Sequence, residues 1–379
     1  MGRVALVAGA IAATMVVGPS PPAGAAVIEV TTTADGGPGS LRDAFAQASV
    51  AVEPTEIVLA DAFYVLDDCA EGDLAHTGTQ PLTITGDDSV IRQTCPGERV
   101  IATDGDLTMV EVNLGGGDLA AGIGGGIEAD TADVTLIRSE VVGNNAPIGA
   151  GVAAIRVTAV ESTVSGNVAG SVGGGIWADQ VADLTNSTVA NNQAGSSGGG
   201  IAVVNTSVVL THATIADNEA PVGANIELQQ GSDALESFAS VIADPEGGSD
   251  CAIDAGATTI SHGYNVETDG TCGFGGAPGD VDGGFDVELG PLADNGGGTA
   301  TQEPLPGSFL IDLVECGFGP VDVTTDQRGV TRAQGTACDV GAVEVEVVVP
   351  PSTTDSTPTT DPGPAPPAVP VTGPATFTG

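Results

Sequence analysis

Five side chains that could bind a ligand come from three successive glycine-led segments: Glu128, Asp130, Arg156, Trp177 and Asp179. Counted from the glycine that opens each segment, the two aspartates share one position, and the glutamate and the tryptophan share another. The arginine belongs to the segment between them. Carboxylate oxygens are ligands that calcium prefers, and a flat indole beside carboxylates suits a sugar ring. These residues predict a ligand-binding patch; the alternative is an acidic, solvated surface with one exposed aromatic side chain.

Other patterns that could carry catalysis are weak. The stretch GSSGG at residues 195–199 matches the G-x-S-x-G pattern of hydrolase nucleophiles but lacks the strand–turn–helix context that this pattern needs. The three histidines, His76, His212 and His262, have no metal-binding spacing. The chain contains no lysine, which excludes Schiff-base chemistry and a phosphate-loop lysine. We therefore predict no catalytic and no metal-binding residues.

The candidate patch must be positioned by a repeat of 24 or 25 residues. Successive segments open at Gly124, Gly149, Gly173, Gly198 and Gly223. Each of the first four has a matching later half that closes on an asparagine: Asn144, Asn167, Asn192 and Asn218. Apolar residues alternate over short runs, and no run has helical periodicity. A fixed period with short alternating runs predicts a solenoid of strands and turns.

We predict an all-β right-handed parallel β-helix in which each repeat forms one coil. Neighbouring coils lie about 4.8 Å apart, so equivalent residues stack. One inner column is predicted to contain Ile127, Val152, Ile176 and Ile201, and the asparagines are predicted to bond along the stack. The repeat glycines would allow a tight corner with positive φ. The five candidate residues would then share an outer patch roughly 10 Å long.

The open end of a solenoid needs a cover, because its free strand edges otherwise pair with other chains. After the first predicted strand, Ser40 and Asp43 form a start that resembles a capping box. One apolar face follows, made of Leu41, Ala44, Phe45 and Ala48. We predict a helix here that serves as the N-terminal lid.

Composition restricts the partners and the redox environment. The 379 residues include 50 acidic and 8 basic side chains, for a net charge of −42. This charge argues against nucleic acids and anionic membranes as partners. Six cysteines occur in sequence-local couples without a C-x-x-C motif, which fits export and disulfides. Six cysteines allow 15 connectivities, of which we favour the nearest-neighbour set: Cys69–Cys95, Cys251–Cys272 and Cys316–Cys338.

The two ends of the chain differ from the repeat region. Residues 1–26 predict a signal peptide, with Arg3, an uncharged apolar run over residues 4–17 and small residues at the cleavage site. That run is too short to span a bilayer comfortably, and we predict no membrane span in the mature chain. Residues 347–379 are rich in Pro and Thr and predict a disordered tail. Between these ends we predict a strand and capping helix at 27–54, the β-helix at 55–250 and a C-terminal module at 251–346.

Several motifs resemble those of known secreted families. GSLRDA at residues 39–44 resembles the CSLREA motif that opens many bacterial β-helix proteins, and the STVSGN and GGGI coils resemble pectin-lyase-like and polymorphic outer-membrane-protein repeats. LGPLADNGGGTATQEPLPGS, DQRGVTR and CDVGAVE resemble the choice-of-anchor Q domain. VPVTG at residues 369–373 is similar to the sortase signal L-P-x-T-G. The resemblance implies an exported bacterial surface protein with a pectin-lyase-like fold.

We predict a secreted or surface-attached monomer that lacks catalytic activity and binds an extracellular glycan or protein, as an adhesin does. Polygalacturonase-type hydrolases carry Gly-His-Gly and Arg-Ile-Lys motifs, and this sequence has neither. The alternatives are a lyase or hydrolase of acidic polysaccharides, for which calcium is a possible cofactor, and a structural component of the cell envelope. Asp326, Arg328 and Arg332 are predicted to form structural ion pairs within the C-terminal module.

Overall fold

The computed structural model describes residues 24–346. Most of the predicted signal peptide and the whole predicted Pro/Thr-rich tail, including VPVTG, lie outside these residues. Every element below belongs to the unit that ends at residue 346. No helix among residues 24–346 is long and apolar enough to cross a membrane.

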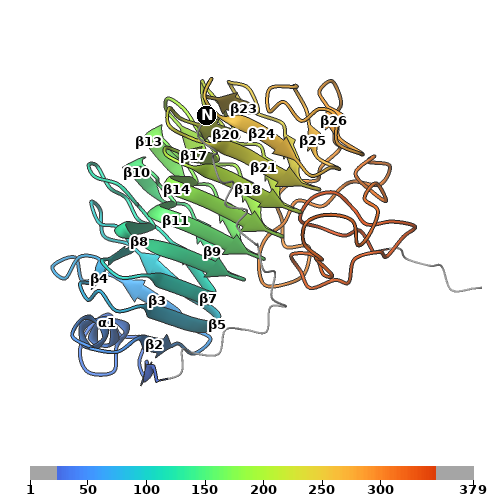
Figure 1. Cartoon of the computed structure of the whole chain (residues 1–379). Coiled ribbons are helices and arrows are strands. Elements are labelled where there is room, and N and C mark those ends of the chain that lie inside the picture. The colour runs from blue at the N-terminus through green and yellow to red at the C-terminus, as the bar shows by residue number, and fades with distance from the viewer. Residues whose placement is uncertain (1–23, 347–379) are drawn as a thin grey trace, which may run out of the picture. The chain divides into compact units, whose positions relative to one another are not determined.

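The described residues form a parallel β-helix whose strands pair with equivalent strands of neighbouring coils (Figure 1). Each repeat coil has three sheet faces, which we call the first, second and third sheet face in chain order from the glycine corner. The first sheet face comprises β4 (Leu74–His76), β6 (Ile101–Thr103), the first parts of β8 (Ile127–Ile137), β11 (Val152–Val160) and β14 (Ile176–Thr185), and then β17 (Ile201–Val203), β20 (Ile226–Leu228) and β23 (Cys251–Ile253).

The second sheet face follows after a short corner. It contains β1 (Ala26–Glu29), β2 (Thr55–Val58), the first parts of β5 (Leu82–Gln93) and β7 (Leu107–Gly115), the later parts of β8, β11 and β14, and then β18 (Ser207–Thr211), β21 (Ala234–Phe238) and β24 (Thr258–Ser261).

The third sheet face completes each coil. It contains β3 (Phe63–Leu66), the later parts of β5 and β7, β9 (Glu140–Val142), β12 (Thr163–Ser165), β15 (Thr188–Ala190), β19 (Thr214–Ala216), β22 (Val241–Ala243), β25 (Val266–Glu267) and β26 (Val281–Asp282). A small additional sheet leads back to the glycine corner: β10 (Asn145–Ile148), β13 (Val168–Val172) and β16 (Gln193–Ala194).

The glycine corner requires glycine for two separate reasons. All five repeat glycines have positive φ, between 51° and 67°, where other residues are strained. The first sheet face also crowds the corner, because a Cβ on Gly173 would lie 2.8 Å from the Cβ of Trp177. The repeat spacing of the glycines therefore follows from the shape of the coil.

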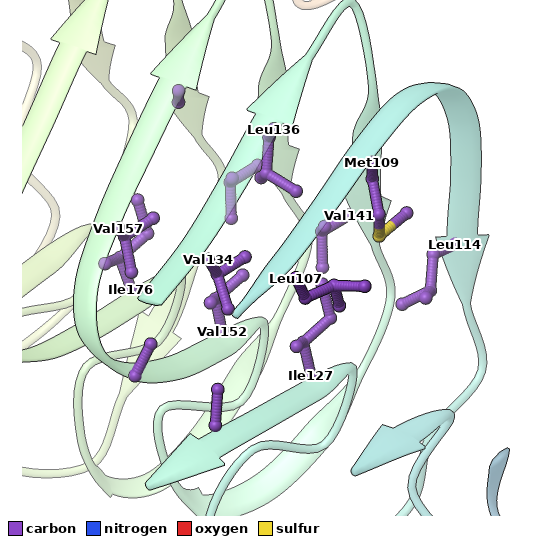
Figure 2. Packing of buried hydrophobic residues seen from close by; sticks show 14 of the residues in the cluster. Leu107, Met109, Leu114, Ile127, Val134, Leu136, Val141, Val152, Val157 and Ile176 are labelled. Carbon is purple, nitrogen blue, oxygen red and sulfur yellow. The ribbon is translucent and has the colours of Figure 1, made fainter. Parts of the chain in front are cut away.

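The core consists of columns that run along the helix axis. The predicted column is confirmed, since Ile127, Val152, Ile176 and Ile201 are direct register partners and fully buried. In Figure 2 the labelled members of this column, Ile127, Val152 and Ile176, point into the same interior as Leu107, Val134 and Leu136 from the second sheet face. Full burial of one such aliphatic side chain contributes about 1.5–3 kcal/mol, so a chain poor in aromatic residues still has a continuous core.

The predicted asparagine ladder is confirmed and lies inside the coil. Asn144, Asn167 and Asn192 each donate from Nδ2 to Oδ1 of the asparagine in the next coil, at 2.9–3.0 Å, and the last of these acceptors is Asn218. All four side chains are buried. Repetition thus satisfies buried amides that would each cost free energy if left unpaired.

A helix closes the N-terminal end of the β-helix. Helix α1 (Leu41–Ser49) begins at the N-cap Ser40, whose Oγ accepts from the Asp43 amide at 3.2 Å. The Asp43 carboxylate accepts from the Gly39 amide at 2.8 Å, which completes the predicted box-like start. The four predicted apolar residues of α1 are buried in the core of the β-helix. The prediction of an N-terminal lid is therefore confirmed.

The C-terminal part begins later than the sequence pattern suggested. The parallel ladder continues through β23–β26, so residues 251–282 still form coils. Residues 283–346, which we call the C-terminal segment, have only isolated antiparallel bridges and pack on the third sheet face. The strands at 251–282 are only two to four residues long, and the turns between them are rich in Gly and Asp. These coils therefore lack the alternating apolar runs of the earlier ones.

The three nearest-neighbour disulfides are confirmed. Cys69 pairs with Cys95, Cys251 with Cys272, and Cys316 with Cys338. The first links β-helix coils near the N-terminus, the second lies in the last coils and the third lies in the C-terminal segment.

The charged residues of DQRGVTR are structural, as predicted. Arg328 pairs with Asp326 at 2.9 Å, and Arg332 pairs with Glu344 at 3.6 Å. Arg332 also donates to Oδ1 of Asn186 in the β-helix at 2.7 Å. Burial lowers the pKa of Arg332 to about 10, although the nearby carboxylates act to raise it. The C-terminal segment is therefore attached to the third sheet face by buried charge as well as by apolar contacts.

Candidate functional site

The outward side of the first sheet face carries a column in which large and small side chains alternate. Register places Ala102, Glu128, Ala153, Trp177, Ala202, Glu227 and Ala252 in successive coils. We call this set the tryptophan column. Glu128 and Trp177 do share a column, as the repeat count predicted. Because each neighbour of Trp177 is an alanine, no bulky side chain in the column adjoins the indole.

Glu227 is a member of this column that does not belong to the predicted patch. It lies four residues after Gly223, which is the same offset as Glu128 and Trp177 from their glycines. Two carboxylates therefore flank the indole, each about 10 Å away, or two coil steps. Extending the same count by two coils would have found it.

The two aspartates also occupy equivalent places. Asp130 and Asp179 each follow the aligned alanines Ala129 and Ala178, at the corner that leads to the second sheet face. The Asp130 amide donates to Oε1 of Glu128 at 3.3 Å. Oδ1 of Asp179 accepts from Asn205 at 2.7 Å. The aspartates thus border the tryptophan column. The carboxylate of Asp179 accepts a described hydrogen bond, whereas that of Asp130 accepts none.

Arg156 does not share the row of Asp130 and Asp179. It aligns with Asp133 and Val181, which belong to the second sheet face. The corner between the first and second sheet faces differs in length from coil to coil: it has three residues in β8, one in β11 and two in β14. Counting from the glycine therefore misplaces the arginine. Its guanidinium contacts Oε1 of Gln180 at 3.1 and 3.2 Å. The structure therefore brings four of the five candidates together and places Arg156 past the corner.

A different arginine reaches the tryptophan column. Arg99 forms an ion pair with Glu128 and lies 3.7 Å from Asp73. No repeat signal marks Arg99, because it precedes the first glycine-led segment. Its guanidinium offsets the charge of Glu128, whereas Glu227 accepts only from Gln229, at 2.9 Å, in the described hydrogen bonds.

A shallow cavity adjoins the C-terminal end of the column. It has a volume of about 470 Å³ and is lined by Glu227, Gln229, Gln230 and Asp254, together with Leu228, Ala252 and Ile253. Amide and carboxylate groups in this lining can accept and donate hydrogen bonds to hydroxyl groups. The tryptophan column and this cavity form a continuous surface along the β-helix axis, since Glu227 and Ala252 belong to both.

Carboxyl groups with raised pKa values lie away from this surface. Burial raises the pKa of Asp183, on the second sheet face, to about 6. Burial likewise raises the pKa of Asp250 and Asp339 to about 6 and that of Glu267 to about 7. A general acid or base is commonly tuned toward neutral pH by such surroundings, and the tryptophan column holds none of these four groups.

Within the described residues, one group of carboxylates has a spacing that could hold a metal ion: Asp250, Glu267 and Asp269. Their oxygens already accept protein hydrogen bonds. Oδ2 of Asp250 accepts from the Thr268 amide at 2.9 Å, and Glu267 accepts from the Cys272 and Gly273 amides at 2.6 and 3.0 Å. The arrangement serves to close the last coils beside the Cys251–Cys272 disulfide. The group contains none of the residues of the tryptophan column.

Comparisons with known proteins add the following. No protein-family model matches the chain, and no curated protein matches it. Among solved structures, the crystal structure of pectate lyase Pel9A is similar over 84% of this chain and 95% of that chain, with 13% identity and a TM-score of 0.35. The strand register itself defines the class of protein: this chain is a parallel β-helix.

Proposed function

We propose that the protein is an exported, non-catalytic β-helix that binds an extracellular glycan along the tryptophan column. The observation that carries the proposal is Trp177, a half-buried indole between two alanines on a regular sheet face. Aromatic faces combine apolar area with a rigid shape, and neighbouring carboxylates and amides supply hydrogen-bonding groups for sugar hydroxyls. The resemblance to CSLREA and choice-of-anchor Q proteins supports a location at the cell surface, and the three disulfides fit export.

Charge indicates which glycans would bind. The surface includes Glu128, Asp130, Asp179, Glu227 and Asp254, in a chain of net charge −42. An anionic polysaccharide would be repelled at low salt. A neutral glycan, or one that carries amino groups, would not be repelled. We therefore expect neutral or amino-sugar polymers to bind more tightly than polygalacturonate.

The experiment is a binding titration against soluble oligosaccharides of neutral, amino-sugar and uronic acid types. Trp177→Ala should weaken binding of the preferred glycan about tenfold or more, which corresponds to about 1.4 kcal/mol. The matched control is Phe63→Ala, because Phe63 is an aromatic side chain that is 70% exposed on a different sheet face. Equal affinity of wild type and Trp177→Ala for every glycan would contradict the proposal.

The alternative is a polysaccharide lyase or hydrolase, with the carboxylates as calcium ligands and Arg156 as a participant. It is tested by incubating the protein with polygalacturonate and alginate, with and without calcium, and measuring unsaturated or reducing ends. Turnover that Asp130→Ala or Arg156→Ala abolishes would replace our proposal with the enzymatic one. Binding of the preferred glycan to cells separates adhesion from a structural role in the envelope. Adhesion predicts that wild-type cells bind this glycan and that cells lacking the protein do not.

A further inference from the structure

The second sheet face carries two adjacent columns of β-branched side chains over four successive coils. Strands β5, β7, β8 and β11 align Thr83, Thr108, Thr135 and Thr158 as direct register partners. Two positions further along, the same strands align Thr85, Val110, Ile137 and Val160. No bulge interrupts the register between these two columns. We call these eight residues the threonine array.

The array is a regular lattice of hydroxyl and methyl groups. Coils repeat every ~4.8 Å, and alternate residues along a strand lie ~6.7 Å apart. The side chains are stiff, because branching at Cβ restricts χ1. Seven of the eight residues are half-buried, and Val110 is buried between its neighbours. The array is therefore flat, ordered and open to solvent.

The hydroxyls of the first column have no role within the protein. Among the described hydrogen bonds, none involves the side chain of Thr83, Thr108, Thr135 or Thr158. By contrast, the threonines on the third sheet face bind the C-terminal segment: Thr163 donates to Ala300 at 2.6 Å and Thr188 donates to Gln327 at 2.7 Å. The four hydroxyls of the first column are thus free to bind water at the spacing of the coils, whereas the Thr85 hydroxyl in the second column donates to Glu56 at 2.8 Å.

The array is neutral in a strongly acidic protein. None of its eight residues is ionisable, although the chain carries a net charge of −42. Charged side chains border it, with Asp133 and Arg156 along one edge and Arg138 at the corner on the other. Glu56 and Asp183 continue the first column beyond Thr83 and Thr158, so the neutral surface ends at these four coils. The array also contains no aromatic ring of the kind that stacks on sugars. These features favour a neutral, hydrogen-bonding partner with a regular surface.

We propose that the threonine array binds ice. Its two repeat distances are close to oxygen spacings of hexagonal ice. Each hydroxyl of the first column can therefore hold a water molecule near a lattice position, while the methyl groups order the water between them. Each contact is weak, and the rigid repetition over four coils lets many contacts form together without further ordering of the side chains. The proposal stands apart from glycan binding by the tryptophan column, which lies on a different face.

The test measures thermal hysteresis and inhibition of ice recrystallisation with the full chain. Wild type is expected to be active. Thr135→Leu, in the middle of the array, should lower activity about tenfold, equivalent to about 1.4 kcal/mol in adsorption. Thr131→Leu is the matched control, since Thr131 is exposed on the same strand but outside the array. The near-isosteric Thr135→Val is a second variant that should fold normally. It should also reduce activity, because it exchanges the hydroxyl for a methyl group and keeps the shape of the side chain.

Each outcome decides the proposal. Inactive, folded wild type would overturn it, and so would equal activity of the Thr135 and Thr131 variants. Binding of wild type to crystalline cellulose that Thr135→Leu abolishes, without any effect on ice, would assign the array to a polysaccharide surface instead. Trp177→Ala should retain full activity toward ice, because Trp177 lies on a different sheet face. The glycan-binding proposal and the ice-binding proposal can therefore fail independently.

Discussion

The asparagine ladder and the C-terminal segment both bury polar side chains, but they supply the partners of these side chains in different ways. In the β-helix, Asn144, Asn167 and Asn192 pair with their copies in the next coil, and the buried groups are neutral. In the C-terminal segment, Arg332 and Glu344 are buried and charged, and each contact occurs once. In the β-helix, the hydrogen bonds of buried polar groups are therefore spread over many coils. In the non-repeating segment, each buried polar group depends on a single pair.

The largest expected effect is that of Arg332→Ala. It leaves the Glu344 carboxylate buried without its partner, which costs about 3–5 kcal/mol for a buried pair. Chemical denaturation monitored by circular dichroism should show the loss. Arg156→Ala is the matched control, because Arg156 is exposed and its described hydrogen bonds go only to Gln180. This variant should change stability by at most about 0.5 kcal/mol. Equal effects of the two variants would mean that the C-terminal segment does not depend on this pair.

A smaller loss is expected when the asparagine ladder is interrupted. Asn192→Ala removes the acceptor of the Asn167 amide and the donor to Val164, at 2.9 Å each. An unsatisfied buried group costs about 1–3 kcal/mol. Asn205→Ala, at an exposed turn, is the control and should be near neutral. A loss as large as that of Arg332→Ala would show that a break in the ladder propagates to neighbouring coils.

The pH dependence of stability should follow the raised pKa values in both regions. The pKa of Asp183 in the β-helix and that of Asp339 in the C-terminal segment are raised from 3.8 to about 6, chiefly by burial. The folded state therefore binds protons more tightly than the unfolded chain. The stabilisation that these groups contribute is complete below about pH 4 and is lost as pH rises through about 6. The thermal midpoint should be higher at pH 5 than at pH 8.

Asp183→Asn tests which region dominates this pH dependence. Its side chain makes no described hydrogen bond, so the variant should flatten the profile without a structural cost. If the profile is unchanged, the carboxyl groups of the C-terminal segment and the last coils account for it. A midpoint that rises from pH 5 to pH 8 would contradict the assignment altogether.

The smallest expected effect on stability is that of Trp177→Ala. Trp177 is only half-buried and contributes to no core cluster, so unfolding should change by no more than about 0.5 kcal/mol. The same variant should abolish most glycan binding. A stability loss comparable to that of Asn192→Ala would indicate that Trp177 serves the fold rather than a ligand.

Sequence alone predicted the parts of this protein that depend on the repeat. In a stack of coils, a fixed spacing along the chain becomes direct contact, so Ile127 above Val152 and Asn167 above Asn192 follow from counting. The same reasoning placed Glu128 in the column of Trp177. The N-terminal helix followed from its local cap and its apolar face, and the disulfides followed from the closeness of each cysteine couple in the chain.

Only the tertiary structure decided the features that break the repeat. Arg156 falls past the corner because the corners of successive coils differ in length, and no periodic signal reports that difference. Arg99 reaches Glu128 from outside the repeat. Contacts such as that between Asn186 and Arg332 join residues 146 positions apart. They depend on which sheet face the C-terminal segment covers, and that choice is set by packing and buried charge rather than by spacing along the chain.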